Sequence, residues 1–373
     1  MTQCPAFIFY HNPSSCRRPL LQNSHETRSF SLSRRPTVAD LARAADVSVA
    51  TVDRVLNARH RVREATAERV LGAAEAIGYH ATPLIKSRLR PKVPERTFAF
   101  LLQREDAFYS QFAGDLSTAA RALTQFRARP VIDFAPDLSA SVMAERLKRL
   151  GESADAVGVV SVDHPRVSDA IVSLRARGVP TFAILTELGA EAAAPYVGRD
   201  NRKEGRTAAW LIAKAARRPG KVGIIVGSHR FLCQETAEIS FRAYLRENAP
   251  EFTLLEPLVN LEEPRIAYAA TQDMIATHPD LVGLYICGGG KEGVIAGARD
   301  EPRSRGLAIV CNELTAEARA GLIDGVLTAV ISTPTALLAE CALAAMAAAI
   351  TEPQEGTQNP IFVPFEVYLP TNI

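Results

Sequence analysis

The residues best suited to specific chemistry lie in the segment Val47–Asn57. If this segment is helical, small and polar side chains share its outward face: Val49, Ala50, Asp53, Arg54 and Asn57. The paired donors of a guanidinium match O6 and N7 of guanine, so Arg54 could read that base with ~1–3 kcal/mol of discrimination. Asp53 could accept a hydrogen bond from a cytosine amino group or could only support Arg54, and we favour the supporting role. Val49 and Ala50 could contact thymine methyl groups but have no polar atoms for hydrogen bonds to bases.

Three short helices would position these residues. Thr37 can cap a first helix, and a tight turn follows at Asp46. Ser48 can cap the second helix, whose inward side chains would be Thr51, Val52 and Val55. A third amphipathic helix, Glu64–Ile77, would complete the core. Two helices joined by so short a turn form a helix-turn-helix, whose second helix lies in the major groove of DNA.

Charge is distributed unevenly along the chain. The 373 residues carry a formal net charge of +2, but residues 34–92 alone carry +6 and residues 93–373 carry −6. A small basic module joined to an acidic body indicates nucleic-acid binding by the first part. Arg59, Arg61 and Arg63 would lie along the DNA backbone and add affinity without sequence information.

The segment Thr37–Tyr79 resembles the DNA-binding head of the lactose-repressor family without a gap. Its core, VSVATVDRVLN at Val47–Asn57, matches the family pattern VSxxTVSRVLN with one change, Asp53 for serine. The resemblance implies a double-stranded DNA operator as partner. Thr37, Ser48 and Asn57 would hold phosphates, the two residues after Ser48 would read bases, and Arg54 would read a guanine. The DNA-binding residues that we predict are Thr37, Ser48, Val49, Ala50, Thr51, Asp53, Arg54, Asn57, Arg61 and Arg63.

A proline-punctuated linker, residues 81–96, follows the head. In the lactose-repressor family this linker forms a hinge helix, and a leucine from each subunit enters the minor groove. Here the corresponding position is Arg88. Pro83 could start a short helix, with Leu84 or Leu89 as the wedge; alternatively, Arg88 could enter a narrow A·T-rich groove.

The rest of the chain alternates short apolar runs with helical patterns of ten to twenty residues, which predicts β-α-β units and a mostly parallel sheet. The nine runs could form one sheet or two. Because the unit restarts near Tyr196–Asn201 after a long loop, we favour two lobes. We therefore expect a disordered leader, or an upstream extension from a misplaced start codon, at 1–33. A DNA-binding head at 34–80, the linker at 81–96 and a body at 97–373 would follow. The lobes would be about 97–197 with 334–355, and 198–332 with 356–373.

The body resembles the effector-binding domain of the same family, which is similar to periplasmic sugar-binding proteins. The resemblance rests on four segments: YVGRDNRKEGRTAA at 196–209, GKVGIIVGS at 220–228, GLYICGGGKEGVIAG at 283–297 and IVCNELTAEARAGLIDGVLTAVI at 309–331. It implies an α/β fold of two lobes behind a three-helix head, a ligand in the cleft outside the carboxyl ends of the strands, and a homodimer. Phe108 and Tyr109 would be stacking platforms for a sugar-like ring, unless both belong to the core. The effector-binding residues that we predict are Phe108, Tyr109, Asp163, Thr186, Asp200, Gly288, Asn312, Glu313 and Thr333.

Three departures from the family pattern favour an atypical effector. Thr186 follows a strand where an acidic residue is usual, an arginine expected near the start of the helix at 236–248 is missing, and Asn312 replaces an aspartate, although Glu313 follows it. Carboxylate and guanidinium groups are what normally hold paired hydroxyls.

The remaining motifs carry little specific chemistry. The segment 288–293, GGGKEG, could cradle a phosphate, but a tight turn is the interpretation that we favour. Neither a metal motif nor a catalytic constellation can be read, so we expect no enzyme, no cofactor and no metal. Without a signal peptide or an apolar run of spanning length, we expect a cytoplasmic protein without a membrane partner. The predicted function is a dimeric, ligand-responsive transcriptional regulator, most simply a repressor. A solute-binding protein of periplasmic type and an α/β enzyme stay open as alternatives.

Overall fold

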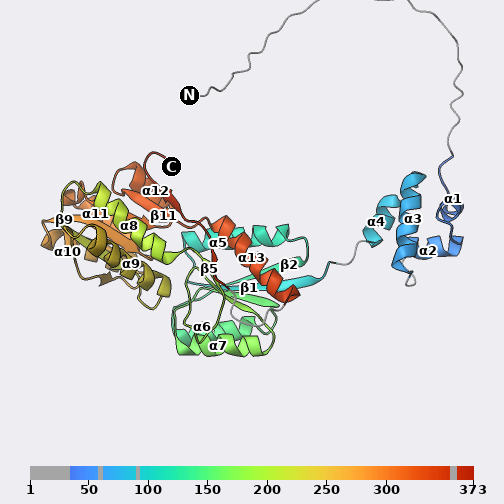
Figure 1. Ribbon diagram of the computed structural model, residues 1–373, viewed down its shortest axis with the longest axis horizontal. Coiled ribbons are helices and arrows are strands. Elements are labelled where there is room, and N and C mark those ends of the chain that lie inside the picture. The colour runs from blue at the N-terminus through green and yellow to red at the C-terminus, as the bar shows by residue number, and fades with distance from the viewer. Residues whose placement is uncertain (1–33, 58–61, 90–92, 353–358) are drawn as a thin grey trace, which may run out of the picture. The chain divides into compact units, whose positions relative to one another are not determined.

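The computed structural model describes residues 34–57, 62–89, 93–352 and 359–373 (Figure 1). For residues 88 and 89 the description covers the backbone and not the side chains. The chain divides into two compact units, one up to Lys92 and one from Val93 onward. We call them the head and the body and describe each by itself.

The described part of the head consists of four helices: α1 (Val38–Ala44), α2 (Val49–Asn57), α3 (Glu64–Ala76) and α4 (Thr82–Leu89). Thr37 caps α1 in a capping box with Asp40, because its hydroxyl accepts from the Asp40 N–H while the Asp40 carboxylate accepts from the Thr37 N–H. Asp46, with φ of 51°, makes the turn into α2. Gly78, with φ of 64°, ends α3, a conformation that costs glycine little.

The head core extends one helix further than the sequence indicated. Leu41, Val52 and Val70, from α1, α2 and α3, are fully buried together, as predicted. Ile85 of α4 is also fully buried in this core. Ile85 thus ties α4, which lies beyond the predicted boundary at residue 80, to the core of the head.

The first lobe of the body is a sheet with the strand order β12-β5-β4-β3-β1-β2. Its strands, all parallel, are β1 (Glu95–Leu102), β2 (Arg127–Phe134), β3 (Ala156–Val159), β4 (Thr181–Ile184), β5 (Tyr196–Gly198) and β12 (Ile361–Phe362). One face packs under α5 (Ala107–Ala122) and α13 (Thr335–Thr351). The other packs under α6 (Ala140–Leu150) and α7 (Pro165–Ala176).

The second lobe repeats this architecture with the order β13-β11-β10-β9-β6-β7, and β8 also pairs with β6. Its strands are β6 (Lys221–Val226), β7 (Thr253–Leu254), β8 (Leu258–Val259), β9 (Leu281–Cys287), β10 (Ala308–Asn312), β11 (Ala329–Ser332) and β13 (Glu366–Tyr368). Helices α8 (Asn201–Ala215) and α9 (Leu232–Asn248) cover one face. Helices α10 (Pro264–Thr277), α11 (Lys291–Asp300) and α12 (Ala316–Ile323) cover the other, with a short 3-10 helix at Pro302–Ser304.

The mixed α/β architecture with mostly parallel sheets was predicted, and two details differ. The apolar run 254–259 forms two short strands, β7 and β8, each parallel to β6. The tail was assigned wholly to the second lobe, but β12 pairs with β5 in the first sheet, and only β13 joins the second, antiparallel to β11. The chain thus passes between the lobes at 198–201, 332–335 and 363–365. No described helix is both long and apolar enough to cross a membrane.

Candidate DNA-reading face and ligand cleft

The exposed face of α2 carries most of the residues predicted to bind DNA. Val52 and Val55 anchor the helix in the head core, and this leaves Ala50, Asp53, Arg54 and Asn57 exposed, with Val49 52% exposed. Ser48 fixes the start of this helix, because its hydroxyl accepts from the Thr51 N–H and lies 2.9 Å from the Thr51 hydroxyl.

Asp53 pairs with a different residue from the one that we favoured. Its carboxylate accepts a hydrogen bond of 2.6 Å from the Asn57 side chain. Successive residues of a helix do not face each other, so Asp53 is better placed for Asn57, one turn on, than for Arg54. Arg63 is exposed at the start of α3, whereas Arg59 and Arg61 lie outside the described residues.

The hinge candidates lie on α4. Leu84 is 44% exposed and is therefore available to a partner surface. The helix itself agrees with the prediction that Pro83 could start one. The side chains of Arg88 and Leu89 lie outside the described part of the chain.

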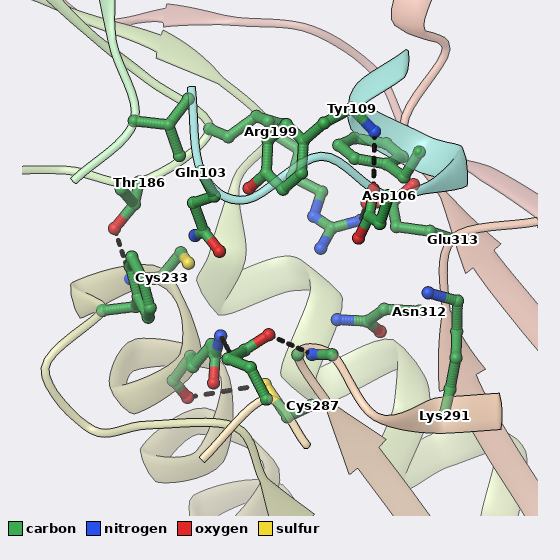
Figure 2. A pocket seen from close by; sticks show the side chains of 18 of the residues that line it. Gln103, Asp106, Tyr109, Thr186, Arg199, Cys233, Cys287, Lys291, Asn312 and Glu313 are labelled. Carbon is green, nitrogen blue, oxygen red and sulfur yellow. Dashed lines mark hydrogen bonds and ion pairs between the residues drawn. The ribbon is translucent and has the colours of Figure 1, made fainter. Parts of the chain in front are cut away.

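A cavity lies between the lobes of the body, where the carboxyl ends of both sets of strands meet (Figure 2). Six of the nine residues predicted to bind an effector line it: Phe108, Tyr109, Thr186, Gly288, Asn312 and Glu313. They lie at the start of α5, after β4 and β9, and at the end of β10 or just after it, far apart in sequence, and the parallel topology brings them together.

The aromatic pair is held at the first turn of α5. Asp106 caps this helix by accepting from the Tyr109 N–H at 2.8 Å, which Figure 2 shows. The rings of Phe108 and Tyr109 are 5.1 Å apart and nearly perpendicular. Tyr109 also packs against the core of the first lobe, as in the alternative that we considered, and it lines the cavity as well. Desolvation raises the pKa of the Tyr109 hydroxyl, which keeps it protonated and able to donate.

A buried charge network lies beneath the cavity. The Arg199 guanidinium contacts Glu204 with Nε at 2.5 Å and Glu313 with Nη1 at 2.8 Å. Thr333, where the chain crosses back to the first lobe, donates its hydroxyl and its N–H to Glu313. Burial alone would lower the pKa of Arg199, but the two carboxylates outweigh this effect and raise it. For Glu204, burial raises the pKa although Arg199 opposes the rise.

Asn312 presents an acceptor without a partner. Its Nδ2 donates to Glu204 at 2.6 Å, which fixes the amide. Its Oδ1 is buried and has no hydrogen-bond partner among the described residues. A buried acceptor left unpaired costs ~1–3 kcal/mol, so a ligand hydroxyl that donates to this atom would remove that cost.

The glycine-rich loop before α11 is a tight turn filled by the chain itself. The Glu262 carboxylate accepts from the Gly289 N–H at 2.8 Å and from the Gln234 amide at 2.7 Å. Gly288, with φ of 109°, could not carry a Cβ without meeting the Gln234 side chain at 2.5 Å. A carboxylate therefore already occupies the place beside the helix N-terminus where a phosphate could have bound.

Three loops around the cavity contain residues with left-handed backbone that are not glycine: Leu185, Glu262 and Glu313, with φ between 64° and 65°. Each such residue costs of order 1–3 kcal/mol and persists where its surroundings hold it. Strain of this kind gathers at ligand-binding sites, and these three residues all line the cavity.

Three predicted residues do not line the cavity. Asp200 caps α8 by accepting from two backbone N–H groups, and Asp163 accepts from the Gly189 N–H at 2.8 Å. Thr333 acts one layer below, through Glu313. Two histidines outside the cavity lining are also engaged: His164 caps α7, and His229 lies 2.5 Å from Glu238.

Several charged and polar lining residues were not singled out from the sequence: Gln103, Arg199, Glu204, Glu262 and Lys291. For Glu204 a signal existed, because it lies one turn before Ala208 on the apolar face of α8, where a carboxylate needs a partner. Lys291 is 5% exposed at the start of α11 and lies 3.3 Å from Glu292.

Bonds across the cavity hold the lobes together. Arg104 of the first lobe contacts Glu263 of the second at 2.8 Å. On another side, the Asp163 N–H donates to the Arg230 carbonyl at 2.8 Å, and the Cys233 N–H to the Thr186 hydroxyl at 3.3 Å. Burial raises the pKa of the Cys233 thiol to about 12, so this cysteine stays protonated beside the cavity.

Comparison with known proteins identifies both parts of the chain. The family described as periplasmic binding protein domain matches residues 98–354, and the family described as bacterial regulatory proteins, lacI family, matches residues 37–82. An uncharacterized HTH-type transcriptional regulator in the aml 5′ region of Streptomyces limosus is 27% identical over 208 residues, 53% of this chain and 54% of that protein. The HTH-type transcriptional regulator MalR of Streptomyces coelicolor is 25% identical over 207 residues, 52% of this chain and 55% of that protein. The chain thus spans about half the length of the curated relatives that it matches.

Solved structures support the fold of the body. A solute-binding protein of an ABC transporter from Agrobacterium vitis, bound with α-D-tagatopyranose, has a TM-score of 0.69 and 21% identity, covering 74% of this chain and 96% of that one. Another from Burkholderia graminis, in complex with D-arabinose, has a TM-score of 0.70 and 16% identity, covering 76% and 98%. The chain therefore belongs to the periplasmic binding protein domain family and carries in front of that domain a helix-turn-helix domain of the lacI family of bacterial regulatory proteins.

Proposed function

We propose that the protein is a transcriptional regulator, most simply a repressor, that binds a double-stranded DNA operator under the control of a small molecule in the cleft. The observation that carries this proposal is the combination, in one chain, of an exposed DNA-reading face on α2 and a polar cavity between two lobes. A solute-binding protein would need only the second of these features.

The head supplies the DNA contacts. Arg54 would read a guanine from the exposed face of α2, with Val49 and Ala50 against thymine methyl groups. Thr37, Ser48 and Asn57 would bond phosphates and fix the register. A single recognition helix covers one half-site, so we propose a homodimer on two half-sites, acting in the cytoplasm.

The body supplies control. The ligand would be a sugar or a related metabolite, as in the solute-binding proteins whose structures contain α-D-tagatopyranose and D-arabinose. Its hydroxyls would meet Asn312 and Gln103, and its ring would meet Phe108 and Tyr109. Binding shifts the population toward closed lobes, which alters the dimer contacts and the fit of the two heads to one operator.

Fluorescence anisotropy with the upstream region of the gene tests this function. We expect saturable binding at about 0.15 M salt that a tenfold excess of unrelated DNA does not abolish. Arg54→Ala should abolish specific binding. Arg69→Ala, which removes the same charge from an exposed position of α3, should retain it. Folded wild-type protein that shows no sequence-specific binding would contradict the proposal and favour the solute-binding alternative.

A further inference from the structure

Carboxylates outnumber cations in the cavity between the lobes. Four acids line it, Asp106, Glu204, Glu262 and Glu313, against two bases, Arg199 and Lys291. Both bases already have partners: Arg199 contacts two carboxylates, and Lys291 lies 3.3 Å from Glu292. Among the described lining residues, no cation is left without a carboxylate within salt-bridge distance, so an anionic ligand would enter a negative surface.

Glu262, which is half-buried, differs from the fully buried Glu204 in what it contacts. Its hydrogen bonds come from two uncharged donors, the Gln234 amide and the Gly289 N–H. No salt bridge to Glu262 is present within the described part of the chain. A carboxylate that is half-removed from water without a salt-bridge partner is costly, because uncharged donors replace only part of its hydration.

The surrounding chain is built to keep this carboxylate in place. A Cβ on Gly227 would lie 1.7 Å from the Glu262 carboxylate, and one on Gly289 would lie 2.1 Å from it, so a side chain at either glycine would displace the carboxylate from this position. Leu261 and Glu262 are consecutive left-handed residues, with φ of 55° and 64°. Two strained residues that deliver a carboxylate into a ligand cavity indicate that the carboxylate has a partner there.

We propose that the ligand is a hydroxylated amine, with an amino sugar as the simplest member of the class, whose ammonium group pairs with Glu262. This inference rests on the proposed function of the cleft as a small-molecule site. The hydroxyls donate to the unpartnered Oδ1 of Asn312, and the ring lies against Phe108 and Tyr109. The charges of Glu262 and Asp106 contribute to the raised pKa of Tyr109, so both carboxylates act on the aromatic platform. A cation over these rings gains cation–π attraction as well.

Calorimetric titration of the full chain with matched sugars tests this inference. Each of glucose, galactose and mannose is compared with its 2-amino derivative and its uronic acid, at about pH 6.5, where such amines are protonated. We expect at least one amino sugar to bind about tenfold or more tightly than its neutral parent, and the uronic acids not to bind. Binding of no amino sugar, or equal binding of the parent or the acid, overturns the inference.

The variant Glu262→Gln isolates the carboxylate. We expect the preference for the amine over its parent to disappear. Glu251→Gln, which removes a charge from an exposed position beyond α9, should keep the preference. Retention of the preference by a folded Glu262→Gln protein also overturns the inference, and the wild-type series decides the matter if the variant does not fold. Because no DNA is present, failure of operator binding would contradict the proposed function and leave these results unaffected.

Discussion

Replacing Arg199 by methionine tests the electrostatics at the base of the cleft. The change removes the cation that contacts Glu204 at 2.5 Å and Glu313 at 2.8 Å, while an unbranched side chain still fills much of the space. Two buried carboxylates then lack a counter-ion. Breaking a buried ion pair from one side costs ~3–5 kcal/mol, so we expect the free energy of unfolding of the body to fall by about that amount. For a domain of this size, the melting temperature should fall by roughly 6–20 °C.

The loss should depend on pH. In the wild type, burial already raises the pKa of Glu204 above its ordinary 4.5. A carboxyl whose pKa is higher in the folded state binds more protons there than in the unfolded state, so its contribution to stability falls as the pH rises through the interval between the two values. Arg199 lowers the pKa of Glu204, so without Arg199 this pKa should be higher in the folded state and the interval should extend to higher pH. The variant should therefore be closest to the wild type near pH 5 and furthest from it near pH 8.

Urea denaturation followed by tryptophan fluorescence measures the effect. Trp210, on α8, is the one tryptophan of the chain, so its emission reports on the body and not on the head. The triple variant Arg199→Met, Glu204→Gln and Glu313→Gln is the control. It should recover most of the loss, because no buried charge stays unpaired. A loss below ~1 kcal/mol in the single variant, typical of exposed pairs, would show that water reaches the network.

Three further changes have defined outcomes. Gly293→Ala should destabilise the body by ~1–3 kcal/mol, because its Cβ would lie 1.8 Å from a backbone carbonyl at the start of α10. Gly114→Ala should instead stabilise the body by ~0.5–1 kcal/mol, because Gly114 lies in α5 with open space around it. Thermal unfolding measures both changes. Arg104→Ala should weaken ligand binding about two- to fivefold, because it removes the contact with Glu263 across the cleft. Calorimetry should give the same loss of affinity for Glu263→Ala. An unchanged affinity would exclude a role of this ion pair in closure of the lobes. Thr37→Ala should lower the stability of the head by ~1 kcal/mol in circular dichroism melts, since it deletes the cap of α1, and no loss would mean that the capping box adds nothing.

Local patterns in the sequence predicted much of the fold. The head helices follow from apolar spacing, capping residues and one tight turn, all of which act within a few residues. Most strands follow from apolar runs between helical segments, since a buried parallel strand is apolar on both faces. β5 and β12 have three and two residues, too few for a pattern, and β12 joins the first lobe through a pairing between residues more than 160 positions apart.

The cleft was predicted in outline, because residues at the carboxyl ends of parallel strands meet at one edge. Its electrostatics were not. Arg199 and Glu313 are 114 residues apart, and only the packed structure brings them within 2.8 Å. Glu262 was equally inaccessible, because its position depends on two left-handed residues and on glycines in separate loops. Such partners depend on tertiary contacts that no local pattern records.

The two kinds of contact around the cleft differ in how they respond to ionic strength. The Arg199 network is buried where the chain crosses between the lobes, so dissolved ions screen it little. The Arg104–Glu263 contact that spans the opening has side chains 56% and 45% exposed, and ions screen it readily. Concentrated salt should therefore weaken the Arg104–Glu263 contact while the Arg199 network stays intact. The affinity of the cleft for a ligand, even an uncharged one, would then fall as the salt concentration rises. The affinity of the head for DNA would change in the same direction.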